Sequence, residues 1–250
     1  MDIFPASLSL FELIVLLLSC FLGAIISTNI GSGGGLIIIA AMGQFLPIQV
    51  LIPIHALTQG GAGVFRSFLF RKHFLKKFYI LFMLGSALGF YLASNILITL
   101  PDFILKLILG LGIISLSLLP NFKIVKISAV TIVGFGALTG FLTMFMGVMG
   151  PLLALFLASF LKERHEIIAT IAWCICTQNL IKSFLFASLG FDYLPWLSLI
   201  SLLILSSYLG IFIGKQLLAK SSNKLFKIML KYVILLLGFK LLIEALISQY

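Results

Sequence analysis

Charged side chains are scarce in this chain of 250 residues, in which only 10% of the residues are Asp, Glu, Lys or Arg. Hydrophobic residues make up 62%, and a soluble domain could not cover that much apolar surface with so few polar groups. The scarcity of charge therefore excludes a soluble protein and indicates one that lies in a membrane. The net charge of +10 does not indicate a nucleic-acid partner, because Lys and Arg are concentrated in short gaps between apolar runs.

Groups that perform covalent or metal chemistry are also missing. Cys20, Cys174 and Cys176 lie within apolar runs, with no His or carboxylate at ligand spacing, so they predict neither a disulfide nor a metal site. The motifs of metalloproteases, serine hydrolases and nucleotide hydrolases are absent, and no paired carboxylates occur within an apolar run. We therefore expect no enzyme activity, no cofactor and no metal.

Long apolar runs fill the chain, and eight of them are long enough to cross about 30 Å of hydrocarbon as a helix. No Lys or Arg precedes the first run, which predicts a retained helix instead of a cleaved signal peptide. Two shorter runs, 33–46 and 150–161, each follow a glycine break and predict half-length helices. The expected fold is thus an all-α polytopic membrane protein with long helices over 8–30, 47–70, 77–98, 102–119, 127–147, 166–189, 195–214 and 226–247.

The two halves of the chain resemble each other. Gly147 lies 116 residues after Gly31 (147 minus 31), and the same ungapped register places KSFLF at 182–186 on RSFLF at 66–70. Agreement of glycines, a cation and apolar residues in one register predicts a duplication that covers nearly the whole chain. The predicted repeats, which together form one membrane domain, are 1–120 and 121–250.

Charge in the gaps indicates how the two repeats are related. RKHFLKK at 71–77 follows the second long run, whereas its repeat mate, ASLGFDY at 187–193, has no Lys or Arg. If each half-length helix crosses the membrane, the second repeat is inverted and four basic segments face the cytoplasm: RKHFLKK, KIVK, KERHE and KQLLAKSSNKLFK. This inverted repeat of about five plus five segments is the preferred prediction. Eight spans with two re-entrant pieces are the alternative.

Glycine breaks at matching places of two membrane repeats indicate a binding site near the midplane. Irregular backbone at membrane depth is tolerated where it is buried in protein or lines a cavity. Each half-length helix presents free N–H groups and the positive end of its dipole, which favour an anion, and Pro151 suits a first helical position. The alternative is that these glycines only pack helices, the role we expect of three other pairs: Gly85 with Gly89, Gly136 with Gly140, and Gly210 with Gly214.

Two cations within apolar helices also indicate an anion. Arg66 and Lys182 are repeat mates, and an ionisable side chain at membrane depth predicts a functional site. Arg66 could instead extend to the interface, and His55 could carry a coupling proton or be a hydrogen-bonded packing residue. Helical spacing adds polar neighbours to both cations. The predicted substrate-binding residues are Gly31, Ser32, Gly33, Gly34, Gly35, His55, Gln59, Arg66, Gly147, Gly150, Pro151, Gln178, Asn179 and Lys182.

The tract GSGGGL at 31–36, the apolar run and polar helix after it, and the weaker copy GVMGPL at 147–152 with TQN at 177–179 resemble the sulfite exporter TauE/SafE family of bacterial membrane permeases. The resemblance covers almost the full chain. It implies two related halves, a bacterial inner-membrane location, and transport of a sulfur-containing anion such as sulfite, sulfoacetate or a related organosulfonate. The chain departs from the family pattern where Met149 and Pro151 interrupt the second glycine tract.

These observations predict an anion permease that works by alternating access around a two-fold-related site. The alternative is a non-transporting membrane scaffold or assembly component, which would bind no anion saturably and would need protein partners. An intramembrane enzyme is disfavoured, because no set of acid, base and nucleophile occurs. The expected partners are the small anion and the lipid bilayer, and the oligomeric state is left open.

Overall fold

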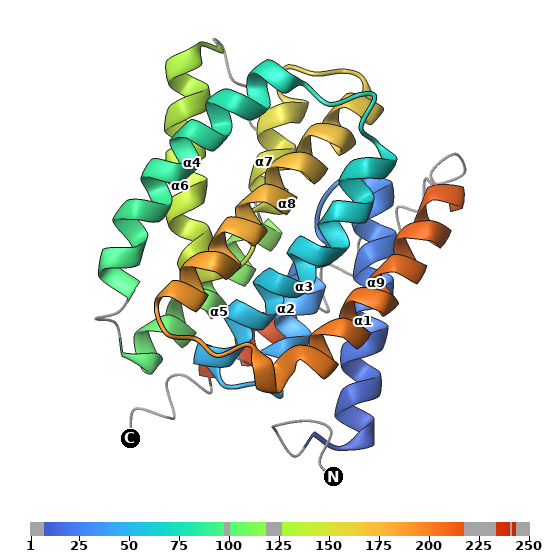
Figure 1. The fold of residues 1–250 in the computed structure, drawn as a ribbon, viewed down its shortest axis with the longest axis vertical. Helices are drawn as coiled ribbons and strands as arrows, with labels where there is room; N and C mark the ends of the chain where they lie inside the picture. The colour runs from blue at the N-terminus through green and yellow to red at the C-terminus, as the bar shows by residue number, and fades with distance from the viewer. Residues whose placement is uncertain (1–7, 98–100, 119–126, 218–233, 241, 244–250) are drawn as a thin grey trace.

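Helices account for all regular structure in the residues that the computed structural model describes, which are 8–97, 101–118, 127–217, 234–240 and 242–243 (Figure 1). This confirms the all-α prediction. The elements within residues 8–217 are α1 (Leu10–Ile30), α2 (Gly34–Met42), α3 (Ile48–Leu69), α4 (Lys76–Leu97), α5 (Asp102–Leu118), α6 (Ala129–Met146), α7 (Gly150–Ala158), α8 (Arg164–Ser188), the 3-10 turn η1 (Leu194–Trp196) and α9 (Leu197–Leu217).

Six of the eight predicted spans appear as helices that are long and apolar enough to cross a membrane. The run 102–119 forms α5, whose 17 residues give about 25 Å of helix, short of a hydrocarbon core of about 30 Å. The predicted span 226–247 lies mostly outside the described residues. The six spans are Leu10–Asn29, Ile48–Leu69, Lys76–Ile96, Ala129–Met146, Arg164–Ser188 and Leu194–Leu217.

α2 and α7 are the short helices that the glycine breaks predict. Each has nine residues, or about 14 Å, which is roughly half of a crossing. Both helices begin within one residue of the predicted positions and end earlier, at Met42 and Ala158. Pro47 restricts the residue before it to extended backbone, so the predicted continuation of α2 to residue 46 is disfavoured.

The helices pack in three pairs. α3 packs against α8 in the middle of the view, α4 packs against α6 on one side, and α1 packs against α9 on the other (Figure 1). α3 and α8 are the most enclosed spans, with 61% of an apolar 18-residue stretch of each buried, against 33–39% in the other four. The polar side chains of α3 and α8 are therefore held in the interior.

Glycines bring the backbones of the outer pairs into contact. A β-carbon at Gly85 of α4 would overlap a carbonyl oxygen of α6, and one at Gly136 of α6 would overlap the Phe82 carbonyl oxygen of α4. Gly210 of α9 lies in the same way on the Phe21 carbonyl of α1. Small residues at a crossing allow this approach, so the predicted packing role of these glycines is confirmed.

Two basic segments lie at one end of the bundle. The rings of His73, after α3, and His165, in the first turn of α8, have centroids 5.5 Å apart. Figure 1 shows that α3 ends, α8 begins and α9 ends at this same end. The segments 71–77 and 162–166 therefore share one face. KIVK at 123–126 and most of KQLLAKSSNKLFK at 215–227 lie outside the described residues.

Candidate functional site

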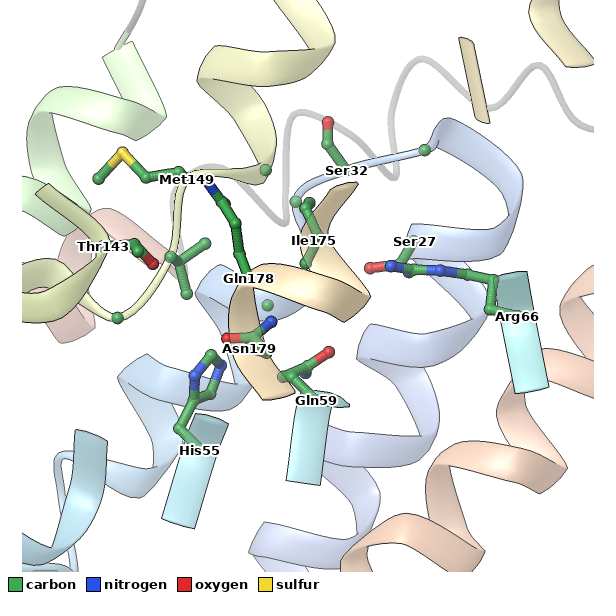
Figure 2. A pocket seen from close by; sticks show the side chains of 16 residues that line it. Ser27, Ser32, His55, Gln59, Arg66, Thr143, Met149, Ile175, Gln178 and Asn179 are labelled. Atoms are coloured by element: carbon green, nitrogen blue, oxygen red, sulfur yellow. The ribbon is translucent and has the colours of Figure 1, made fainter. Parts of the chain in front are cut away.

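An internal cavity lies between α3, α8 and the two glycine breaks (Figure 2). Its volume is about 30 Å³, measured as the space open to the centre of a water molecule, which suits a ligand of a few heavy atoms. Eleven of the fourteen predicted binding residues line it. They are Gly31, Ser32, Gly33, Gly35, His55, Gln59, Arg66, Gly147, Gly150, Gln178 and Asn179.

Three predicted residues lie away from the cavity lining. Gly34, the first residue of α2, packs against α1, and a β-carbon there would overlap the carbonyl oxygen of Gly23 in α1. Pro151 is in the first turn of α7, and Lys182 is buried against two lining residues, Thr143 and Gly147. The structure thus brings Arg66 and both breaks to the cavity, whereas Lys182 contacts the second break without lining the cavity.

Five further residues line the cavity without having been singled out from the sequence. Two of them, Ser27 and Thr143, are 116 residues apart, so the register that relates the glycine breaks could have found them as a pair. The other three are apolar and carried no signal of binding in the sequence: Val148, Met149 and Ile175.

Both predicted repeats contribute matching positions to the cavity. Five pairs of its lining residues are separated by the same 116 positions. A ligand in this cavity would therefore contact equivalent parts of the two halves. The pairs are Ser27 with Thr143, Gly31 with Gly147, Ser32 with Val148, Gly33 with Met149, and Gln59 with Ile175.

Left-handed glycines end the long helices that lead into the breaks. Gly31 has a φ of 86° and Gly147 a φ of 72°, which an L side chain adopts only at a cost. α2 and α7 then begin without a side-chain cap. Gly35 and Gly150 line the cavity, so both short helices begin beside it, with the positive ends of their dipoles.

Arg66 brings a positive charge to the cavity. Its side chain is 6% exposed, and its Nε has no hydrogen-bond partner in the described part of the chain. Figure 2 shows it extending from α3 toward Ser27. Since a buried cation is costly without a counter-charge, the position of the acidic residues is informative. All of those in the described ranges lie in loops or first turns, away from the cavity lining: Glu12, Asp102, Glu163, Glu166 and Asp192.

His55 lies between the two breaks. A β-carbon at Gly35 would be 3.9 Å from its Nε2, and one at Gly147 would be 3.9 Å from its Nδ1. The ring is 1% exposed, and neither nitrogen has a hydrogen-bond partner among the described residues. Buried polar groups are normally paired, so the imidazole is available to a ligand in the cavity.

Gln178 has its donor committed to the protein. Its Nε2 donates to Ser86 Oγ at 2.9 Å and to Thr139 Oγ1 at 3.3 Å. These contacts tie α8 to α4 and α6 and leave the amide oxygen, an acceptor, as the other polar atom of the side chain. Gln178 therefore lines the cavity, but its amide N–H groups are less available to an anion than those of Gln59 and Asn179.

Lys182 holds the second break in place. Its ammonium is fully buried and donates to the Gly147 carbonyl at 2.9 Å and to Thr143 Oγ1 and the Thr143 carbonyl at 3.3 and 3.4 Å. These carbonyls are at the C-terminal end of α6, where the helix dipole favours a cation. The structure thus places Lys182 at the carbonyls of the second break, outside the cavity lining.

Lys182→Met is expected to lower the stability of the protein. The substitution leaves buried carbonyls at the end of α6 without their donor, at a cost of about 1–3 kcal/mol. At about 2–4 °C per kcal/mol for a chain of this size, the melting temperature in detergent falls by several degrees. Lys162→Met, at an exposed loop position, is the matched control and leaves the melting temperature unchanged. An unchanged melting temperature with lost anion binding would instead assign Lys182 to the substrate.

Comparison with known proteins gives one match. The family model described as Sulfite exporter TauE/SafE matches residues 16–241, which include most of α1, all of α2 to α9 and every residue of the cavity lining. No curated protein and no solved structure matches the chain.

Proposed function

Because the chain belongs to the sulfite exporter TauE/SafE family of membrane transport proteins, we propose that it is a permease for a small sulfur oxyanion or organosulfonate. The bacterial inner membrane is the proposed location. The observation that carries the proposal is the buried cavity at which both glycine breaks meet Arg66. Such a cavity, positive and without a carboxylate in the lining, has the chemistry of an anion site.

The donors around the cavity suit the oxygens of an oxyanion. Arg66 can donate two parallel hydrogen bonds, each of which is worth about 1.5–3 kcal/mol when charge-assisted. The first turns of α2 and α7 add N–H groups and a dipole contribution of about 0.3–1 kcal/mol each. Gln59, Asn179 and His55 complete the set with side-chain donors.

The arrangement of the helices supports an inverted repeat. In the 116-residue register α1, α2, α3 and α4 correspond to α6, α7, α8 and α9. The α1–α9 pair is thus the counterpart of the α6–α4 pair, and α3 packs on its own counterpart, α8. In Figure 1, α3 and α8 run in opposite directions. Movement of one half against the other around the cavity is the proposed basis of alternating access.

The shared face of the segments 71–77 and 162–166 supports the five-plus-five count. Of the two short helices, α7 lies between these segments in the chain, so the segments would lie on opposite sides of the membrane if α7 dipped in and returned. Their contact through His73 and His165 is the arrangement expected when α7 carries the chain across, and α2 is its counterpart in the first repeat. By the positive-inside rule, this end of the bundle faces the cytoplasm.

A thermal-shift screen of the purified protein against sulfite, thiosulfate, sulfoacetate, sulfate and matched carboxylates tests the proposal. A ligand that binds the folded state stabilises it, by about 2.7 kcal/mol at a concentration of 100 times the Kd. We expect saturable stabilisation by at least one sulfur anion and none by the carboxylates. Absence of a saturable shift across the panel would favour the scaffold alternative.

A further inference from the structure

The two halves of the cavity differ in the residues that they place at equivalent positions. At four pairs of equivalent positions, the first half has a hydroxyl, an amide or a glycine where the second half has an apolar side chain or a proline. Three of the second-half residues, Val148, Met149 and Ile175, line the cavity. The pairs are Ser32 with Val148, Gly33 with Met149, Gly35 with Pro151, and Gln59 with Ile175.

Of the three polar side chains that the second half brings to the cavity, Thr143, Gln178 and Asn179, the first two are already engaged by the protein. Thr143 Oγ1 accepts a hydrogen bond from Lys182, and the Gln178 amide nitrogen donates to Ser86 and Thr139. Pro151 has no N–H where Gly35 supplies one. Figure 2 shows Met149 and Arg66 on opposite sides of the pocket. The cavity therefore has a donor-rich side around Arg66 and a donor-poor side around Val148, Met149 and Ile175, which we call the apolar wall.

We propose that the apolar wall selects anions with three acceptor oxygens and a non-accepting fourth position, such as sulfite or a small sulfonate, over sulfate and other four-oxygen anions. The inference rests on the proposed function and specifies its substrate. Three oxygens can face Arg66, Gln59 and the first turn of α2, whereas a fourth would be desolvated against the wall without a donor. A ligand oxygen left without a hydrogen bond weakens binding, so the apolar wall disfavours four-oxygen anions even though it does not contact Arg66.

The test uses substitutions that give the wall a donor. Val148→Thr keeps the shape of the side chain and adds a hydroxyl, and Ile175→Gln reproduces the residue of the first repeat, Gln59. Kd values for sulfite and sulfate are measured by calorimetry at a mildly alkaline pH, where both are mainly dianions. We expect the wild-type protein to bind sulfite more tightly than sulfate. In either variant, the ratio of the sulfate Kd to the sulfite Kd falls about tenfold or more.

Phe184→Tyr is the matched control, because it adds a hydroxyl to α8, the helix of Ile175, at a residue that is 71% exposed on the outer surface. The control keeps the wild-type ratio. If Val148→Thr does not fold, Ile175→Gln carries the test. An unchanged ratio in a folded wall variant, or wild-type protein that binds sulfate as tightly as sulfite, would overturn the inference while leaving the anion site intact. Wild-type protein that binds neither anion would overturn the proposed function itself.

Discussion

Replacing Arg66 by Gln is expected to weaken sulfite binding by about 10- to 100-fold, through the loss of a charge-assisted hydrogen bond worth about 1.5–3 kcal/mol. The guanidinium is buried at the cavity, and no carboxylate is found in the described interior, so an anion is its natural counter-charge. Glutamine keeps donors at the position but removes the charge. The folded state should not suffer, since burying an unpaired charge costs free energy and its removal relieves that cost.

Sulfite-dependent thermal stabilisation and sulfite flux into proteoliposomes both measure this effect. Arg71→Gln is the matched control. Arg71 is exposed two residues after the end of α3, with its guanidinium 3.9 Å from the centre of the Phe68 ring, and its replacement leaves sulfite binding unchanged. Arg66→Lys keeps the charge but loses the planar fork and should give an intermediate affinity. Wild-type affinity in a folded Arg66→Gln protein would remove Arg66 from the site.

Gly34→Ala is expected to lower the stability of the protein much more than Gly134→Ala. A β-carbon at this position would overlap the Gly23 carbonyl oxygen and press on Ser27 Oγ. Because the obstacle is backbone, α1 and α2 must separate, and overpacking of this kind costs about 1–3 kcal/mol or more. The expected results are a melting temperature lowered by about 2–12 °C and a poor yield of monodisperse protein in detergent.

Gly134→Ala provides the control for this substitution. Gly134 is also within a helix, but beyond the nearby backbone of that helix no atom of the described residues lies within 4 Å of the position that its β-carbon would occupy. Alanine is favoured over glycine in a helix by about 0.8–1 kcal/mol, so this variant keeps or slightly raises the melting temperature. Equal melting temperatures for the two variants would mean that α1 and α2 do not cross as closely as the structure shows.

The glycine breaks and most of the cavity residues could be predicted from the sequence. Glycines at matching places of a repeat indicate where helices are interrupted, and charged residues within apolar runs indicate a functional site. Glycine after apolar sequence predicted where α1 and α6 end, and the register from Gly31 to Gly147 placed both breaks in one site. Arg66 and His55 could be found because a membrane interior leaves few reasons for such residues. These signals come from chemistry that apolar helices rarely contain.

Other features depend on contacts that the sequence does not encode locally. Lys182 is the repeat mate of Arg66, yet the structure places its ammonium on the Gly147 carbonyl, because a flexible side chain can reach the carbonyls at the end of α6. The apolar wall of Val148, Met149 and Ile175 was missed for the opposite reason. Apolar residues are ordinary in a membrane helix, and only the fold shows that these three face a polar cavity.

The position of the bound anion shows whether the cavity between the two glycine breaks is the substrate site. Selenite, the selenium analogue of sulfite, can be located by anomalous scattering in crystals of the protein grown with it, after proteoliposome assays have shown that it competes with sulfite. We expect an anomalous peak in the cavity between Gly31 and Gly147, within hydrogen-bond distance of Arg66. A peak elsewhere in the bundle, from a protein that transports the anion, would contradict this expectation.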